Sequence, residues 1–275
     1  MARAGSINYQ VSNIIKAHNG IRQSKLESRN NSGLTSENGH KVSDKFHSYK
    51  SLDNARNDLT NLAKYAKAEF GIKDMSKIDK EIVNQWIKNK NITYNTASNY
   101  LSEINKVHEH LNITKEEVKE LRQELKKELK INKLETRAYK HLERIQLPEK
   151  SQPAFELQRD YGLRVKAAIH IKISNIQGNR LLYQEKGGKW NEKELTPTLV
   201  LKIKENAVEG KYTVPEDTYY GQLKREIEKT GQKFNGTHGI RHTYAQKELE
   251  AGKSKQEVSE AMGHSREEIT NTYIR

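Results

Sequence analysis

The chain has 275 residues, and its 49 Lys and Arg against 36 Asp and Glu give a formal net charge of +13. This length suffices for one large domain or two ordinary ones. The chain has no cysteine, which excludes a disulfide scaffold, a thiol nucleophile and a cysteine-ligated zinc site. Because the positive charge is spread along the sequence, we expect a polyanionic partner, with nucleic acid ahead of a ribosomal or membrane-surface role.

Membrane insertion is excluded by the distribution of apolar residues. Hydrophobic residues make up 33% of the chain and charged residues 31%. No stretch approaches the roughly 18 apolar residues of a spanning helix, and the first ten residues lack the apolar run of a secretory signal. The absence of cysteine is compatible with a reducing cytoplasm.

The N-terminal half is expected to be helical after a polar beginning. A short helix is predicted over 9–17, and the Asn-, Ser- and Gly-rich composition of 17–50 predicts a mobile or surface-hugging segment. Apolar residues at steps of three and four then predict helices between Ser51 and Gly71, over about 79–87 and over about 96–111.

Thr114 is predicted to cap a fourth, highly charged helix in this half. We interpret its charge run as a solvated face, with a surface that follows a phosphate backbone as the alternative. The pattern loosens over 133–150, where a proline follows Leu147 and indicates an extended linker.

Beyond the linker the pattern predicts helices around a small β-sheet. Residues 155–170 are predicted to be helical, and alternating isoleucines over 171–176 predict a strand. Residues 181–183 and 199–201 are expected to complete the sheet, on either side of a Gly-Gly turn. The chain from Tyr219 onward is predicted to be helical.

Four residues near the C-terminus suggest a chemical reaction. His238 and Arg241, three positions apart, share one helix face, where an imidazole and a guanidinium address the same anion. His264 follows a glycine, and Tyr273 comes nine positions later. If these groups converge, donors for phosphate oxygens lie beside a phenol that can attack phosphorus, which is the composition of a covalent phosphoryl-transfer site.

Other interpretations of these residues are less favoured. His238 and His242 are four positions apart and could hold zinc, but no Glu follows His238 as in zinc proteases. The turn from Lys186 to Lys189 lacks the spacing of a Walker phosphate-binding loop. Taken alone, Tyr273 is typical of a packing residue, and only its neighbours favour catalysis.

In this order and spacing, the residues resemble those of the tyrosine recombinase, or phage integrase, family. The segment Asp-Tyr-Gly-Leu-Arg-Val at 160–165 is similar to the one that carries the family's first arginine, here Arg164. Residues 185–189 look like the hairpin with the family's lysine, Lys186 being the better candidate and Lys189 the reserve. More weakly, residues 96–104 resemble a helix of the family's core-binding domain.

The resemblance implies a mainly α fold with a small β-sheet, in two domains. A SAM-like helical core-binding domain over 46–132 would be followed by a linker over 133–150 and a mixed α/β catalytic domain over 151–275. The polar residues 1–45 could be an arm that reads a second DNA site, as in some integrases. The implied catalytic residues are Arg164, Lys186, His238, Arg241, His264 and Tyr273.

The resemblance also implies a reaction. Tyr273 would attack the scissile phosphate and form a 3′-phosphotyrosine, which keeps the phosphodiester energy, so that no cofactor and no metal is required. The two arginines and His264 would hold the nonbridging oxygens, since they donate to developing negative charge. His238 would accept or steer the tyrosine's proton, and Lys186 would protonate the departing 5′-oxygen.

The implied partners are double-stranded DNA with inverted half-sites and further copies of the chain, as a dimer or tetramer on DNA. The implied role is integration, excision or transposition of a mobile element in a prokaryotic cytoplasm. A non-cleaving DNA-binding protein of the same fold is the alternative, and a relaxing topoisomerase is a third possibility.

Two positions depart from the family's pattern. An acidic residue often lies three places after the first arginine, where this chain has Ala167, so another group must hold the catalytic arrangement. The chain also ends two residues past Tyr273, whereas relatives commonly continue into a terminal helix. This difference predicts a shortened chain or another mode of assembly.

Overall fold

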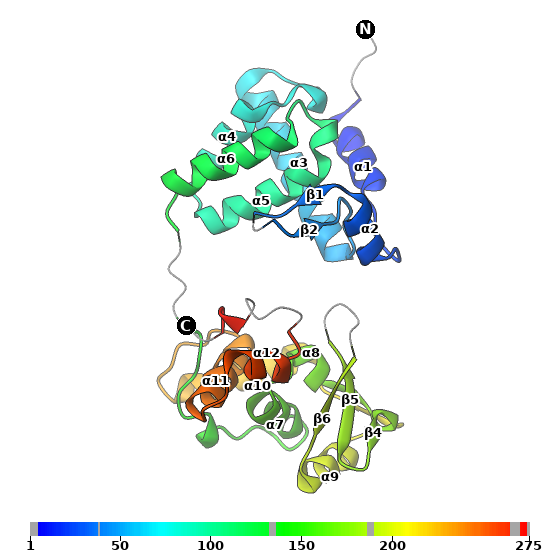
Figure 1. Ribbon diagram of the computed structural model, residues 1–275, viewed down its shortest axis with the longest axis vertical. Helices are drawn as coiled ribbons and strands as arrows, with labels where there is room; N and C mark the ends of the chain where they lie inside the picture. Colours follow the sequence, from blue (N-terminus) through cyan, green and yellow to red (C-terminus); the bar gives the residue numbers. More distant parts are fainter. Residues whose placement is uncertain (1–4, 38, 132–135, 186–189, 265–269, 274–275) are drawn as a thin grey trace. The chain divides into compact units, whose positions relative to one another are not determined.

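The computed structural model describes residues 5–37, 39–131, 136–185, 190–264 and 270–273. The chain divides into two compact units, Met1–Lys133 and Leu134–Arg275 (Figure 1). The prediction of a mainly helical chain with small β-sheets is confirmed. Among the described residues, no helix has the length and apolar character needed to span a membrane.

The first unit is a helical bundle with a small hairpin beside it. Its α-helices are α1 (Ile7–Ala17), α2 (Lys25–Asn31), α3 (Tyr49–Phe70), α4 (Lys80–Lys88), α5 (Tyr94–Val107) and α6 (Lys115–Glu128). Strands β1 (Leu34–Thr35) and β2 (Lys41–Val42) pair antiparallel, and two short 3₁₀ helices are η1 (Met75–Lys77) and η2 (His108–His110). The apolar faces of α1 and of α3 to α6 form one core.

Side-chain caps explain where the long helices begin and end. Ser48 and Ser51 form a capping box at the start of α3, so the helix begins slightly earlier than predicted. Gly71 ends it in the left-handed conformation, with a φ of 69°. Thr114 forms the predicted cap of α6, together with Glu117.

The N-terminal residues are more structured than their composition indicated. The predicted short helix is present as α1, and its apolar residues Val11, Ile14 and Ile15 are buried in the core of the unit. The segment 17–50, predicted to be mobile or surface-hugging, contains α2 and the β1–β2 hairpin, and Phe46 joins the same core. A few well-placed apolar side chains are enough to attach a polar segment.

A half-buried pair of carboxyl groups makes the first unit sensitive to pH. Burial, followed by the charge of Asp58 on α3, raises the pKa of Glu103 on α5 to about 8. Burial also raises the pKa of Asp58. The folded chain therefore holds a proton that the unfolded chain releases at the ordinary pKa of 4.5.

We expect this pair to destabilise the fold as the pH rises. Its stabilising contribution is complete below the unfolded pKa and is lost as the pH rises through the folded pKa. The thermal midpoint, measured by circular dichroism, should decrease as the pH is raised from about 5 to about 9. Glu103→Gln should make this decrease smaller. Glu69→Gln, at an exposed position of α3, is the control. An unchanged pH dependence in Glu103→Gln would contradict this account.

The second unit combines helices with two small antiparallel sheets. Its α-helices are α7 (Gln152–Tyr161), α8 (Val165–Ala168), α9 (Pro197–Glu205), α10 (Glu216–Lys229), α11 (His238–Glu250) and α12 (Lys255–Ala261). Its strands are β3 (His170–Lys172), β4 (Ile176–Gln177), β5 (Arg180–Gln184), β6 (Trp190–Glu194) and β7 (Lys211–Thr213), and its 3₁₀ helices are η3 (Leu142–Arg144) and η4 (Ile173–Asn175).

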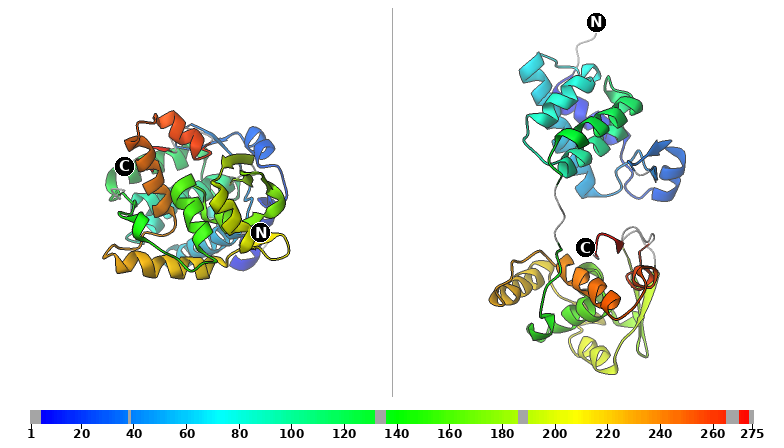
Figure 2. Two further views of the ribbon diagram at one scale, coloured as in Figure 1. Left: turned by 90° about the horizontal axis from the view of Figure 1, so that it is seen from below. Right: turned by 60° about the vertical axis from the view of Figure 1, so that its left-hand side comes forward.

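The sheets have simple antiparallel pairings. Strand β3 pairs with β7, and β5 lies between β4 and β6, with Gln184 opposite Trp190 at one end of the β5–β6 ladder. Figures 1 and 2 show the sheet of β4, β5 and β6 to one side of the helices of this unit.

Three local predictions for this unit were wrong. Residues 155–170 are not one helix, because Gly162 ends α7 with a φ of 67° and His170 already belongs to β3. Residues 199–201 belong to α9 and not to a strand, since Thr196 caps a helix that begins at Pro197. Residues 171–176 do not form one strand, because η4 separates β3 from β4.

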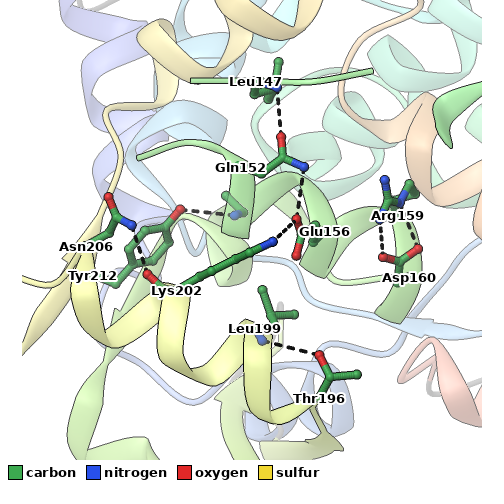
Figure 3. Close-up of polar contacts among 11 residues, drawn as sticks. Leu147, Gln152, Glu156, Arg159, Asp160, Thr196, Leu199, Lys202, Asn206 and Tyr212 are labelled. Atoms are coloured by element: carbon green, nitrogen blue, oxygen red, sulfur yellow. Dashed lines mark hydrogen bonds and ion pairs between the residues drawn. The ribbon is translucent and has the colours of Figure 1, made fainter. Parts of the chain in front are cut away.

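Polar contacts fix α7, which leads into the first predicted catalytic arginine. The Glu156 carboxylate accepts from the Gln152 amide at 3.0 Å and from the Lys202 ammonium of α9 at 2.9 Å (Figure 3). The Tyr212 hydroxyl of β7 accepts from the backbone N–H of Ala154 at 3.1 Å. Helix α7 also packs against α11, so the helix is held from several sides.

Candidate active site

The second unit brings together the predicted site residues that the structure describes. Arg164 precedes α8, and His238 and Arg241 belong to the first turn of α11. His264 follows α12, and Tyr273 lies in a turn near the end of the chain. Lys186 and its alternative Lys189 lie outside the described residues.

Arg241 is at the centre of this group and is only 1% exposed. Its Nη1 donates to the carbonyl of Gly162, and its Nη2 donates to the carbonyl of Met262. The same Nη2 lies 3.2 Å from Nε2 of His264. Its Nε is buried without a hydrogen-bond partner, which leaves one strong donor of the guanidinium unsatisfied.

Glycines allow the close approaches on which Arg241 depends. A Cβ on Gly162 would lie 2.5 Å from the ring of Tyr244, which belongs to α11, the helix of Arg241. A Cβ on Gly239 would lie 2.3 Å from the ring of Tyr139. Any larger residue at either position would push α11 away from the segments it contacts.

The contacts of His264 define its tautomer. A guanidinium has only donors, so Nε2 of His264 accepts from Arg241 and the ring proton is on Nδ1. That Nδ1 lies 2.8 Å from Oγ1 of Thr270, to which it donates. Burial, followed by the positive charges of Arg241 and Arg164, lowers the pKa of His264 to about 3. The ring is therefore neutral at physiological pH.

Tyr273 is 8% exposed and is enclosed by imidazole rings. Its ring centroid lies 4.7 Å from that of His242, 5.1 Å from that of His264 and 6.4 Å from that of the exposed His238. The guanidinium carbon of Arg241 lies 5.7 Å from the same centroid. The phenol thus lies among groups that bind anions and transfer protons.

His242 also holds the backbone of Tyr273, a contact that the sequence did not reveal. Its Nδ1 lies 3.2 Å from the carbonyl oxygen of Tyr273, to which it donates. Burial lowers the pKa of His242, which favours the neutral ring. The sequence offered one cue, because four positions place His242 on the same face of α11 as His238.

Glu185 is the second group that sequence analysis missed. It directly follows β5, and its side chain is 2% exposed. One carboxylate oxygen forms an ion pair with Nη1 of Arg164, and the other lies 3.9 Å from Nη1 of Arg241. The carboxylate therefore offsets part of the charge of both arginines from one point, a task expected of an acidic residue at position 167, where this chain has alanine.

The β5–β6 hairpin is braced against the turn that carries His264. A Cβ on Gly263, whose φ is 65°, would lie 2.4 Å from the Asn191 amide of β6. Lys193 of β6 donates to the carbonyl of Ala261 at 2.6 Å, and burial, followed by the charge of Arg241, lowers its pKa to about 8. These contacts couple the position of Glu185 to that of His264.

A comparison with known protein families identifies one family. The sequence profile of the phage integrase family matches residues 112–275. No curated protein gives a significant sequence match to the chain.

Solved structures share the fold at low sequence identity. The XerH site-specific recombinase bound to a palindromic difH substrate is 15% identical with a TM-score of 0.66, over 98% of this chain and 90% of that one. A lambda integrase dimer bound to a COC′ core site is 16% identical with a TM-score of 0.64, over 98% and 77%. The Tn1549 transposon integrase, in complex with a circular intermediate DNA, is 12% identical with a TM-score of 0.58, over 99% and 95%.

Proposed function

Because the chain belongs to the phage integrase family, we propose that it is a site-specific recombinase that cleaves and rejoins DNA through a covalent 3′-phosphotyrosine. The observation that carries this proposal is the convergence of Tyr273 with Arg241, His264 and His238 in the second unit. The net charge of +13 suits a partner made of phosphodiesters.

In the proposed cleavage step, Oη of Tyr273 attacks the scissile phosphorus. A bond forms between Oη and phosphorus while the bond from phosphorus to the 5′-oxygen breaks, and the phosphate stays on the 3′ side as an ester of Tyr273. Rejoining reverses the step when a 5′-hydroxyl attacks that ester. The number of ester bonds is unchanged, so no nucleotide is consumed.

Arg164 and Arg241 would hold the nonbridging oxygens and offset the charge that grows on them. The unsatisfied Nε of Arg241 is the donor best suited to gain a phosphate oxygen. Glu185 keeps the two like charges together before the phosphate arrives, since it contacts both guanidinium groups.

His264 would change its role when the phosphate binds. Its Nε2 accepts from Arg241, and the two arginines contribute to its low pKa. A phosphate between the arginines offsets their charge and raises that pKa, so that Nε2 could take up a proton and donate it to a nonbridging oxygen.

Two proton transfers complete the step. His238, whose ring lies beside that of Tyr273, would accept the phenol's proton. Lys186 would protonate the departing 5′-oxygen, with Lys189 in reserve. Both lysines follow Glu185 closely in the sequence, so the hairpin that holds the arginines would also deliver the proton.

The proposed partners follow from the reaction. Recombination joins two duplexes through four cleavages, so we propose that dimers on inverted half-sites assemble into a tetramer on DNA. The related structures of XerH bound to a difH substrate and of lambda integrase bound to a core site support a DNA partner. Integration, excision or transposition of a mobile element, in a prokaryotic cytoplasm, is the proposed role.

The proposed domains keep the predicted bounds, with a core-binding domain over 46–132, a linker over 133–150 and a catalytic domain over 151–275. The arm over 1–45 also stays a prediction. Because α1 is part of the core of the first unit, deleting residues 1–45 would damage that unit. The proposed DNA contact of residues 1–45 is therefore better tested by exchanging surface charges of this segment than by deleting it.

The proposed chemistry is tested with nicked duplexes taken from the DNA that flanks the gene. Cleavage of such a duplex releases a short strand and traps the covalent intermediate. We expect a protease-sensitive adduct on a denaturing gel, formed without metal or nucleotide. Retarded complexes on native gels without any adduct would instead favour the non-cleaving DNA-binding protein. Relaxation of any supercoiled plasmid, whatever its sequence, would favour a topoisomerase.

A further inference from the structure

Three potential metal ligands meet in the first unit. They are His18, at the end of α1, and Glu109 and His110, both in η2. One ligand atom from each lies within 4.8 Å of the other two. The two segments are far apart in the sequence, so the cluster is a product of the fold.

Each of the two imidazoles has a buried nitrogen without a hydrogen-bond partner. Nδ1 of His18 lies 2.8 Å from the carbonyl oxygen of Asp44, so this nitrogen carries the ring proton and Nε2 carries a lone pair. His18 is 3% exposed, and its Nε2 has no hydrogen-bond partner. Nε2 of His110 is likewise buried without a partner. The rings meet edge to face, with centroids 5.2 Å apart.

Glu109 supplies an anionic ligand between the two rings. Its Oε1 lies 3.6 Å from Nε2 of His18 and 3.6 Å from Nε2 of His110. Ligands at roughly 2.0–2.2 Å around a tetrahedral zinc ion are about 3.3 Å apart. The observed distances from Oε1 therefore require a movement of only a few tenths of an ångström.

We propose that His18, Glu109 and His110 bind a zinc ion. Two imidazoles and a carboxylate suit zinc among the biological metals, and a proton on Nδ1 held by a backbone carbonyl is the usual orientation of a metal-binding histidine. Glu109 is exposed, which leaves a side of the site open for water as the fourth ligand. Zinc would satisfy both unpartnered nitrogens.

The proposed ion would act as a structural clamp. It would link the end of α1 to the connection between α5 and α6, two segments of the first unit that are far apart in the sequence. Because the site forms only in the folded chain, zinc binding would add its binding free energy to folding. The proposal is independent of the recombinase chemistry, which involves residues of the second unit.

In the test, metal is first removed from the full-length chain with EDTA. The chain is then titrated with zinc sulfate in the presence of a chromophoric chelator that competes for the zinc. We expect the wild type to bind one zinc ion per chain tightly. Glu109→Gln and His110→Gln should bind zinc about tenfold or more weakly. His108→Gln is the matched control, because His108 belongs to the same η2 but its Nδ1 contacts the Asn105 carbonyl at 3.1 Å. His108→Gln should bind one zinc ion per chain as tightly as the wild type.

Two further readouts separate this site from the histidines around Tyr273. Cobalt chloride should give an absorption spectrum of a four-coordinate ion in the wild type, which Glu109→Gln should change. Zinc should raise the thermal midpoint of the wild type and of His108→Gln, and EDTA should reverse the rise. The proposal would be overturned if the wild type bound no zinc ion tightly. It would also be overturned if both site variants, with unchanged circular dichroism, bound zinc as tightly as the wild type.

Discussion

Tyr273→Phe is expected to bind DNA as tightly as the wild type and to form no covalent adduct. The substitution removes one hydroxyl and leaves the ring that packs against His242 and His264. The fold and the surface charge of the protein therefore stay the same. The proposed nucleophile is lost, and a phenyl ring cannot replace it.

The measurement compares native gels, which report binding, with denaturing gels of nicked duplexes, which report the adduct. Tyr183→Phe is the matched control, since Tyr183 is a buried tyrosine of β5 in the same unit and should keep the adduct. An adduct from Tyr273→Phe would assign the attack to another residue. Weaker binding by Tyr273→Phe would give the hydroxyl a role in recognition.

Glu185→Ala is expected to reduce cleavage on the order of 10²-fold, because a displacement of about 1 Å of catalytic groups has effects of that size. The substitution leaves Arg164 and Arg241 as two like charges without the carboxylate that contacts both. Loss of one partner of a buried ion pair is strongly destabilising, by about 3–5 kcal/mol, so the thermal midpoint should fall as well.

A second substitution separates positioning from stability. In the Glu185→Ala background, Ala167→Glu should restore part of the cleavage rate, since position 167 is where the family's pattern has its acid. Glu192→Gln, on the exposed face of β6, is the control for a lost negative charge. Single-turnover rates at saturating protein measure the effect. Cleavage by Glu185→Ala at the wild-type rate would show that the arginines are held without the carboxylate.

The sequence predicted elements well where caps and periodicity agree. Thr114, with Glu117, marks the start of α6. Gly71, after a long apolar stripe, marks the end of α3. The apolar run at 199–201 was assigned to a strand because short apolar runs suit a strand or a helix equally. The deciding cue was local: Thr196 and Pro197 form a helix start.

Those parts of the candidate site whose residues lie close together in the sequence could be predicted from their spacing. Arg241 and His238 share one turn of α11, and Gly162 and Arg164 belong to one short motif. Glu185 was not predictable in this way, because its partners belong to two other segments and only tertiary packing brings them together. His18 and His110 meet for the same reason.

The burial of Tyr273 and Arg241 has a consequence for the proposed cleavage. With a guanidinium that is 1% exposed and a tyrosine that is 8% exposed, binding of a phosphodiester would require the rings around them to repack. Repacking of a dry cluster is unfavourable unless new contacts compensate for it. For the proposed recombinase, a chance encounter with DNA would supply few such contacts, whereas an assembly on the recombination site would supply many. The dense packing would then limit cleavage at other DNA sites.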